Sequence, residues 1–241
     1  GYAELDWEIP ISQAALVLVD VWDRHYLKDT AARAEEIIQR KIRALAQTCR
    51  QAGLHIIHAP SPGMAKTHPA WVRLVSEEEM SGGRGDDWPP AEFRRKSGDY
   101  KKYAQPSEPR DKERAELRAG LRIHPDVQPE VDDVVIATGE ELHRYCKQKG
   151  ILFLFYLGFN TNACILLRDY GTLEMSKRGY EIIIVRDCTT GMESFETHDE
   201  LWQTRGAILF LEMFTKFTDA KGFRFGKYSI TSEDLIGGLA E

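Results

Sequence analysis

The sequence lacks any long apolar run. The longest, at about residues 151–159, is far shorter than the roughly 20 apolar residues that a membrane-spanning helix requires. The first residues also lack the basic segment followed by an apolar one that marks a secretory signal. We therefore expect a soluble, cytoplasmic protein.

The sequence is also poor in cysteine pairs and in metal-binding spacings. It has no CxxC pair, no Cys/His spacing suited to zinc, and no HxH or HxxxH pattern among His25, His58 and His68. We predict reduced thiols, no metal site and no cofactor. The four cysteines are Cys49, Cys146, Cys164 and Cys188.

No excess of basic charge is present. The formal net charge is −6, and acidic and basic residues are interspersed along the chain. This composition argues against nucleic acid or an anionic membrane as the main partner, and it favours a small-molecule substrate or a protein partner.

What the sequence does contain is a regular alternation of short apolar runs with segments of helical periodicity. Alternating strands and helices favour right-handed crossovers and a parallel sheet covered on both faces. We predict a single α/β domain over residues 1–241, a three-layer αβα sandwich around a mostly parallel sheet. The expected strands are 15–20, 55–62, 131–138, 151–157, 180–187 and 215–218, and the expected helices are 30–53, 139–149, 164–178 and 198–214.

The segment 81–111 interrupts this alternation. It contains GGRGDDWPP, a basic cluster at 94–96 and QPSEPRDK. Long irregular segments in compact domains are usually functional loops or disorder, and the aromatic residues Trp88, Phe93 and Tyr100 favour order. We predict an inserted, lid-like segment.

Polar residues follow most of the expected strands. In parallel sheets the ligand crevice lies beyond the carboxyl ends of the strands, so these residues are the first candidates for a site. They include Asp20, Trp22, Asp23 and His25 after the first strand, His58, Ser61 and His68 in and after the second, and Asn160 and Cys164 after the fourth.

Cys164 and Asp20 make the clearest chemical pair. A cysteine in the first turn of a helix meets unpaired N–H groups and the positive end of the helix dipole, which lower its pKa and favour the nucleophilic thiolate. A carboxylate from a neighbouring strand end is suited to move the thiol proton. The alternatives are a buried free cysteine and a strand-end acid that caps a turn.

Glu140 and Glu141 also follow a strand. However, Thr138 and Glu141 form a capping-box pattern before a helix, which is the simpler interpretation.

Two blocks of sequence carry a resemblance to a known family. ALVLVDVWD, and later YLGFNTNACILLRDYGTLEMSKRGYEIIIVRDCTTG, resemble the isochorismatase-like cysteine hydrolases, which include nicotinamidases and N-carbamoylsarcosine amidohydrolases. The resemblance implies that Cys164 is the nucleophile and Asp20 the acid/base. It also implies a cis peptide between Phe159 and Asn160, and an oxyanion hole formed by the amides of Asn160 and Cys164. We expect Trp22, His25, His58 and Phe159 to bind the substrate.

The sequence departs from the family at one important position. Ala137 stands where the resemblance leads us to expect a catalytic lysine. Three kinds of residue could replace this lysine, and the sequence does not favour one of them. They are a Lys or Arg of the inserted segment such as Lys96, His25, and His58. The metal-binding Asp-x-His element of nicotinamidases also has no counterpart around residues 58–71, which argues against that activity.

Three functions follow as hypotheses. The first is hydrolysis of a C–N bond in a small amide, urea-like or imide-like compound through a thioester at Cys164. The second is a catalytically silent protein that binds a ligand or partner. The third is vinyl-ether hydrolysis of the isochorismatase type, for which the cysteine is not required. The resemblance also suggests a homodimer or homotetramer.

Overall fold

The computed structural model describes residues 4–81, 88–213 and 228–240. By its internal contacts the chain divides into a larger unit, residues 1–74 and 121–241, and a smaller unit, residues 75–120. Among the described residues, no helix has both the length and the apolar character needed to cross a membrane.

The larger unit is built on a sheet whose strand order is β3-β2-β1-β4-β5-β6. Every neighbouring pair in that sheet is parallel, as expected for strands linked by helical crossovers. The strands are β1 (Ala14–Val19), β2 (His55–Ala59), β3 (Val134–Val135), β4 (Phe153–Phe159), β5 (Glu181–Thr190) and β6 (Tyr228–Ile230).

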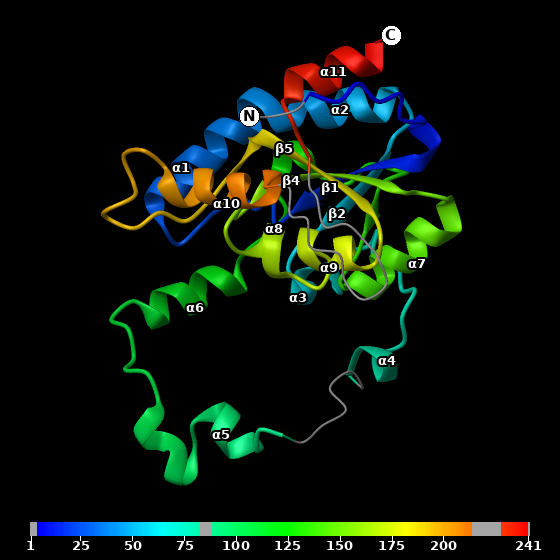
Figure 1. Ribbon diagram of the computed structural model, residues 1–241. Coiled ribbons are helices and arrows are strands. Elements are labelled where there is room, and N and C mark those ends of the chain that lie inside the picture. The colour runs from blue at the N-terminus through cyan, green and yellow to red at the C-terminus, as the bar shows by residue number, and fades with distance from the viewer. Residues whose placement is uncertain (1–3, 82–87, 214–227, 241) are drawn as a thin grey trace. The chain divides into compact units, whose positions relative to one another are not determined.

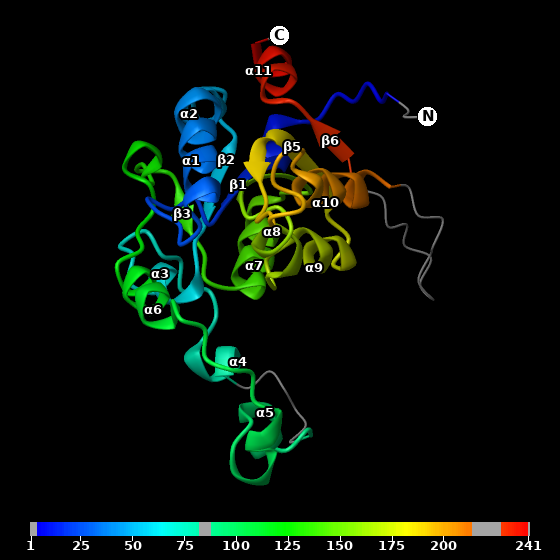
Figure 2. The same ribbon diagram turned by 90° about the vertical axis from the view of Figure 1, so that its left-hand side faces the viewer.

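Helices cover both faces of this sheet. Figure 1 shows α1, α2 and α11 on one side of the strands and α7, α8 and α9 on the other, and Figure 2 gives the same unit from a second direction. The helices of the larger unit are α1 (Lys28–Ile37), α2 (Arg43–Gln51), α3 (Pro62–Ala65), α7 (Gly139–Lys149), α8 (Cys164–Leu167), α9 (Thr172–Lys177), α10 (Trp202–Glu212) and α11 (Ser232–Ala240).

Strand β1 shows why the fold has three layers. Leu16 and Leu18 pack in one buried apolar cluster with residues of α2, whereas Val17 and Val19 pack in another with residues of α7. All of β1 is buried, because successive side chains of a strand point to opposite faces and both faces are covered. The predicted three-layer α/β fold is therefore confirmed.

Several predicted elements are found near their expected positions. The helix expected over 30–53 begins at Lys28, contains one π-helical turn at Ile38–Ile42 and ends before Gly53, which has a φ of +86°. Helix α7 has the predicted bounds, and the Thr138 hydroxyl caps it by accepting from the Glu141 amide. Strand β3, by contrast, has two residues where eight were expected.

The helix expected from Cys164 to Arg178 is wrong as a single element. It is two short helices, α8 and α9, separated by a turn in which Tyr170 is fully buried and donates a hydrogen bond to the Pro60 carbonyl. Burying this large side chain requires the chain to leave the helical path after Leu167. Helix α10 also begins at Trp202, later than expected.

The end of the chain was predicted less well. Strand β6 and helix α11 were not expected, and the strand predicted at 215–218 lies outside the described residues. Asp187 on β5 holds the start of α11, accepting hydrogen bonds from the amide and hydroxyl of Ser232.

The smaller unit is wider than the predicted insertion at 81–111, since it covers residues 75–120. Phe93 packs edge-on against Tyr100 with a centroid distance of 5.2 Å, and Lys96 lies 3.4 Å from the Phe93 ring centroid. Its role as a lid stays a prediction. The unit contains α4 (Glu77–Ser81), α5 (Ala91–Arg95), α6 (Asp111–Ala119) and a 3₁₀ helix at Gly98–Tyr103.

Candidate active site

The carboxyl ends of three adjacent strands bring the candidate residues together. Val19, the last residue of β1, is in register with Ala59 on β2 and with Gly158 on β4. Asp20, Ser61 and Asn160 follow these ends. Gly158 permits the close approach, because a Cβ there would lie 2.0 Å from the Val19 carbonyl oxygen.

Asp20 is fully buried directly after β1 and has a φ of +47°, a conformation that Asp tolerates better than most side chains. The Ser61 hydroxyl donates to its Oδ1 at 3.2 Å. Burial raises the pKa of Asp20 to about 6, and hydrogen bonding to Cys164 and the charge of Arg168 offset part of this increase. A carboxyl group that titrates near neutral pH is suited to both accept and return a proton.

Arg168 is the charged residue beside this carboxylate. Its Nη2 lies 3.6 Å from Asp20 Oδ2 and donates to the Ser61 hydroxyl at 3.2 Å. The residue directly follows α8, and its amide donates to the Cys164 carbonyl at 3.3 Å, so the side chain starts one helical turn after the cysteine. The sequence prediction did not include Arg168, although its spacing of four from Cys164 was a usable signal.

Cys164 is half-buried at the first position of α8. The prediction that its position lowers the thiol pKa needs correction. Burial raises that pKa to about 12, and the charge of Asp20 raises it further, while Arg168 acts in the opposite direction. Because α8 is a single turn, its dipole is too small to outweigh burial. At neutral pH the thiol keeps its proton and lies next to a base.

The turn between β4 and Cys164 has the expected backbone. A cis peptide joins Phe159 and Asn160, as the resemblance implied. The Asn160 carbonyl accepts from the amides of Ala163 and Ile165 at 3.1 and 3.2 Å, which closes the turn. Within the described residues, the amides of Asn160 and Cys164 themselves donate no hydrogen bond. Both remain available to an oxygen anion.

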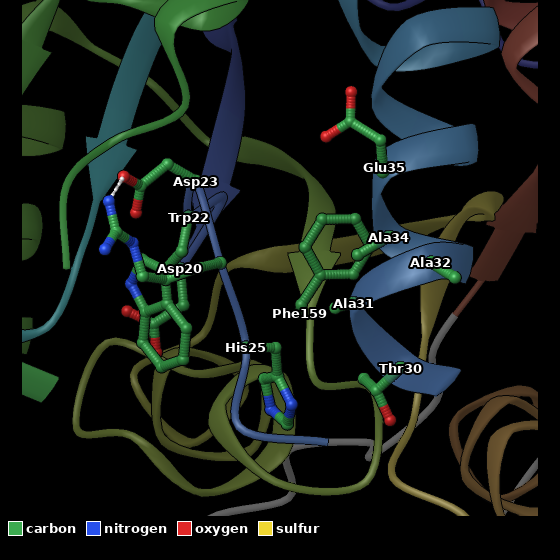
Figure 3. Close-up of a pocket in the computed structure, with 11 residues that line it drawn as sticks. Asp20, Trp22, Asp23, His25, Thr30, Ala31, Ala32, Ala34, Glu35 and Phe159 are labelled. Carbon is green, nitrogen blue, oxygen red and sulfur yellow. Dashed lines mark hydrogen bonds and ion pairs between the residues drawn. The ribbon is translucent and has the colours of Figure 1, made fainter. Parts of the chain in front are cut away.

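A cavity with a volume of about 340 Å³ adjoins Asp20. Figure 3 shows Asp20 and Trp22 on one wall and residues of α1 on the other, with His25 and Phe159 between them. Trp22, His25 and Phe159 thus line the same cavity, and their role in substrate binding stays a prediction. Cys164 is not among the residues that line this cavity.

His25 is held by two hydrogen-bonding contacts. Its Nδ1 accepts from the Leu27 amide at 3.0 Å, and its Nε2 lies 3.2 Å from the side-chain amide of Asn160. In a neutral ring whose Nδ1 accepts, Nε2 carries the proton, so the oxygen of the Asn160 amide is the atom suited to face it. Burial lowers the pKa of His25, which favours this neutral form. The imidazole therefore positions Asn160.

The structure places His58 elsewhere, and its expected position in the substrate site needs correction. Its side chain is on the same face of β2 as Ile56, towards α2, and its ring bonds to Asp133 at 3.0 Å. Arg50 holds the same carboxylate at 2.6 Å. The hydrogen bond of this buried ring to Asp133 therefore stabilises the fold and does not face a substrate.

Ala137 is buried next to Ala65 and Val135, with no charged group at its own position. Its amide donates to the buried carboxylate of Glu141 at 2.7 Å, and the Trp71 indole donates to the same group. Thr138 therefore caps α7, whereas the Glu141 carboxylate holds the segment that follows β3.

Three buried polar atoms around the site have no hydrogen-bond partner among the described residues. Such atoms are rare in folded proteins, and a polar ligand would satisfy them. They are Asp20 Oδ2, Trp22 Nε1 and Arg168 Nε.

The fold and site define a three-layer α/β protein with a cysteine and a buried aspartate at adjacent strand ends. The model of the isochorismatase domain family matches residues 14–220, and the chain belongs to that family of hydrolases. No curated protein sequence matches the chain.

Solved structures share the fold at low sequence identity. A cysteine hydrolase from Pseudomonas syringae pv. phaseolicola 1448A is 18% identical with a TM-score of 0.56, over 98% of this chain and 96% of that one. An isochorismatase-like hydrolase from Alkaliphilus metalliredigens is 16% identical with a TM-score of 0.52, over 93% and 98% of the two chains. A putative hydrolase of the isochorismatase family from Chromobacterium violaceum ATCC 12472 is 15% identical with a TM-score of 0.53, over 99% and 98%.

Proposed function

We propose that the protein hydrolyses a C–N bond in a small amide-, urea- or imide-like compound through a thioester at Cys164. The observation that carries the proposal is that Cys164 and the buried carboxylate of Asp20 follow the ends of the adjacent strands β4 and β1, where burial raises the pKa of Asp20 to about 6. This pairing is suited to transfer a proton at the moment of attack.

Asp20 takes the thiol proton while Cys164 Sγ bonds to the carbonyl carbon, and the amides of Asn160 and Cys164 hold the resulting oxygen anion. The C–N bond then breaks, and the leaving amine takes the proton from Asp20. Water attacks the thioester with Asp20 again as base, which releases the acid and restores the thiol.

Two alternatives predict different behaviour of Cys164. The buried, protonated thiol is also what a silent binding protein would show, and in that case no amide would acylate it. Vinyl-ether hydrolysis would proceed without the sulfur. The Pseudomonas syringae protein that shares the fold is a cysteine hydrolase, which supports the thioester route.

The test is a panel of small amides, ureas and cyclic imides, with release of amine or ammonia as the readout. Mass spectrometry of the peptide that contains Cys164 detects the acyl adduct. We expect turnover in the wild type and a loss of at least about a thousandfold in Cys164→Ala and Cys164→Ser, because alanine has no nucleophile and a serine hydroxyl is a far weaker nucleophile than a thiol. Full activity in Cys164→Ser would overturn the proposal. Thermal unfolding of both variants checks that the fold is retained.

A further inference from the structure

Arg168 is the positively charged side chain beside the buried carboxylate of Asp20, with Nη2 3.6 Å from Oδ2. We propose that Arg168 supplies the fixed positive charge of the Asp20–Cys164 pair and holds the two groups for reaction. This role rests on the proposed function, since it describes how the same site is balanced.

Contacts from three segments define the arrangement. Ser61, after β2, donates to Asp20 and accepts from Arg168, so one hydroxyl bridges the two charged side chains. Cys164 begins α8, and Arg168 follows the end of that helix. Buried Tyr170, in the turn after α8, is neutral because burial raises its pKa strongly. Arg168 is thus the cation among the groups that face Asp20.

Two histidines of the larger unit, His25 and His58, could also supply a positive charge, but both are engaged in other contacts. His25 is neutral and contacts Asn160, and His58 is bound to Asp133. Ala137 carries no charge. Among the described residues, the ion pair of Asp20 is the one with Arg168.

An arginine at this site plays a different chemical role from a lysine. Its guanidinium stays protonated at any pH the protein experiences, so it does not exchange protons with the thiol or the amine. Asp20 carries out every proton transfer, and Arg168 favours the ionised forms of Asp20 and Cys164. Its buried Nε has no hydrogen-bond partner among the described residues.

The test measures the reactivity of Cys164 with iodoacetamide as a function of pH, which requires no substrate. The other three cysteines are buried, and peptide mapping restricts the readout to Cys164. In the wild type, we expect the alkylation rate to rise as Asp20 ionises near pH 6. In Arg168→Met the rise should shift upward by about one pH unit, and the rate at pH 6 should fall about fivefold. Arg168→Lys should keep most of the wild-type profile.

Arg178→Met is the matched control. The Arg178 side chain has 35% exposure and pairs with Glu140 at 2.8 Å, whereas the Arg168 side chain has 33% exposure. We expect the control to keep the wild-type profile. Coincident profiles for Arg168→Met and the wild type, or an equal shift in Arg178→Met, would overturn the role of Arg168. A shifted profile together with no amide turnover would instead contradict the proposed function alone.

Discussion

Ser61 and Asp20 form the hydrogen bond that links the base of the site to its cation. The hydroxyl donates to Asp20 Oδ1 at 3.2 Å while accepting from Arg168 at the same distance. Ser61, two positions after β2, therefore fixes the orientation of the Asp20 carboxylate and the position of the Arg168 guanidinium.

Replacing Ser61 by Ala tests this link. The substitution removes a hydrogen bond that lowers the pKa of Asp20, so that pKa should rise above about 6. The acidic limb of the turnover profile should move upward, by less than in Arg168→Met, because a neutral donor contributes less than a charge. Ser61→Thr keeps the hydroxyl and should retain the wild-type limb. An unchanged limb in Ser61→Ala would show that the Ser61 hydroxyl does not influence the pKa of Asp20.

Asp20→Asn should increase stability while abolishing turnover. The folded-state pKa of about 6 lies above the usual 3.8, so ionising this buried group destabilises the fold as pH rises from 3.8 through 6. The rise of about two in this pKa lowers the free energy of unfolding of the ionised wild type by at most about 3 kcal/mol. The Asn variant avoids this loss.

Urea unfolding at two pH values measures this effect. At pH 8 the free energy of unfolding of Asp20→Asn should exceed that of the wild type by about 1–3 kcal/mol, and the two should converge near pH 4. A variant less stable than the wild type at pH 8 would show that Asp20 stabilises the fold in its charged form.

The sequence predicted that Cys164 and Asp20 lie at adjacent strand ends, but it predicted their surroundings less well. Cys164 and Asp20 follow strand ends, a position readable from apolar runs, and the family resemblance reinforced both. The arginine was overlooked because a basic residue in an expected helix ordinarily marks a solvated face. Its partner Asp20 is remote in sequence, and only the register of β1 with β4 brings the two together.

The direction of the Cys164 pKa shift was also beyond the sequence. The helix-dipole argument assumed a long helix, whereas the burial of Tyr170 ends α8 after one turn. Likewise His58 lies next to the end of β2, yet the alternation of side chains along the strand turns it towards α2.

Asp133→Asn should test the structural role of the His58 network. Hydrogen bonds from His58 and Arg50 outweigh burial and lower the pKa of Asp133 well below its usual range, so the charge stabilises the fold at neutral pH. Removing it takes the shared carboxylate away from both His58 and Arg50, although Arg50 keeps its ion pair with Glu130, and should cost about 3 kcal/mol at pH 7. The loss should shrink in acid, as the wild-type carboxylate itself becomes protonated. Alkylation of Cys164 should be unaffected. Altered alkylation in the folded variant would show that His58 influences the active site after all.

Gly158→Ala should be among the most damaging single changes in the sheet. The new Cβ would meet the Val19 carbonyl oxygen at 2.0 Å, and φ at this residue is +113°. Gly150→Ala is the control, since φ there is +74° but no atom lies within 4 Å of the added carbon.

The control isolates backbone strain, which costs about 1–2 kcal/mol. Gly158→Ala adds a steric clash that forces β4 away from β1, so urea unfolding should show a loss at least about 2 kcal/mol larger than in Gly150→Ala. Any folded Gly158→Ala protein should also show slower Cys164 alkylation, because the same displacement separates the turn that carries the thiol from Asp20. Equal losses in the two variants would mean that β1 and β4 do not need this close approach.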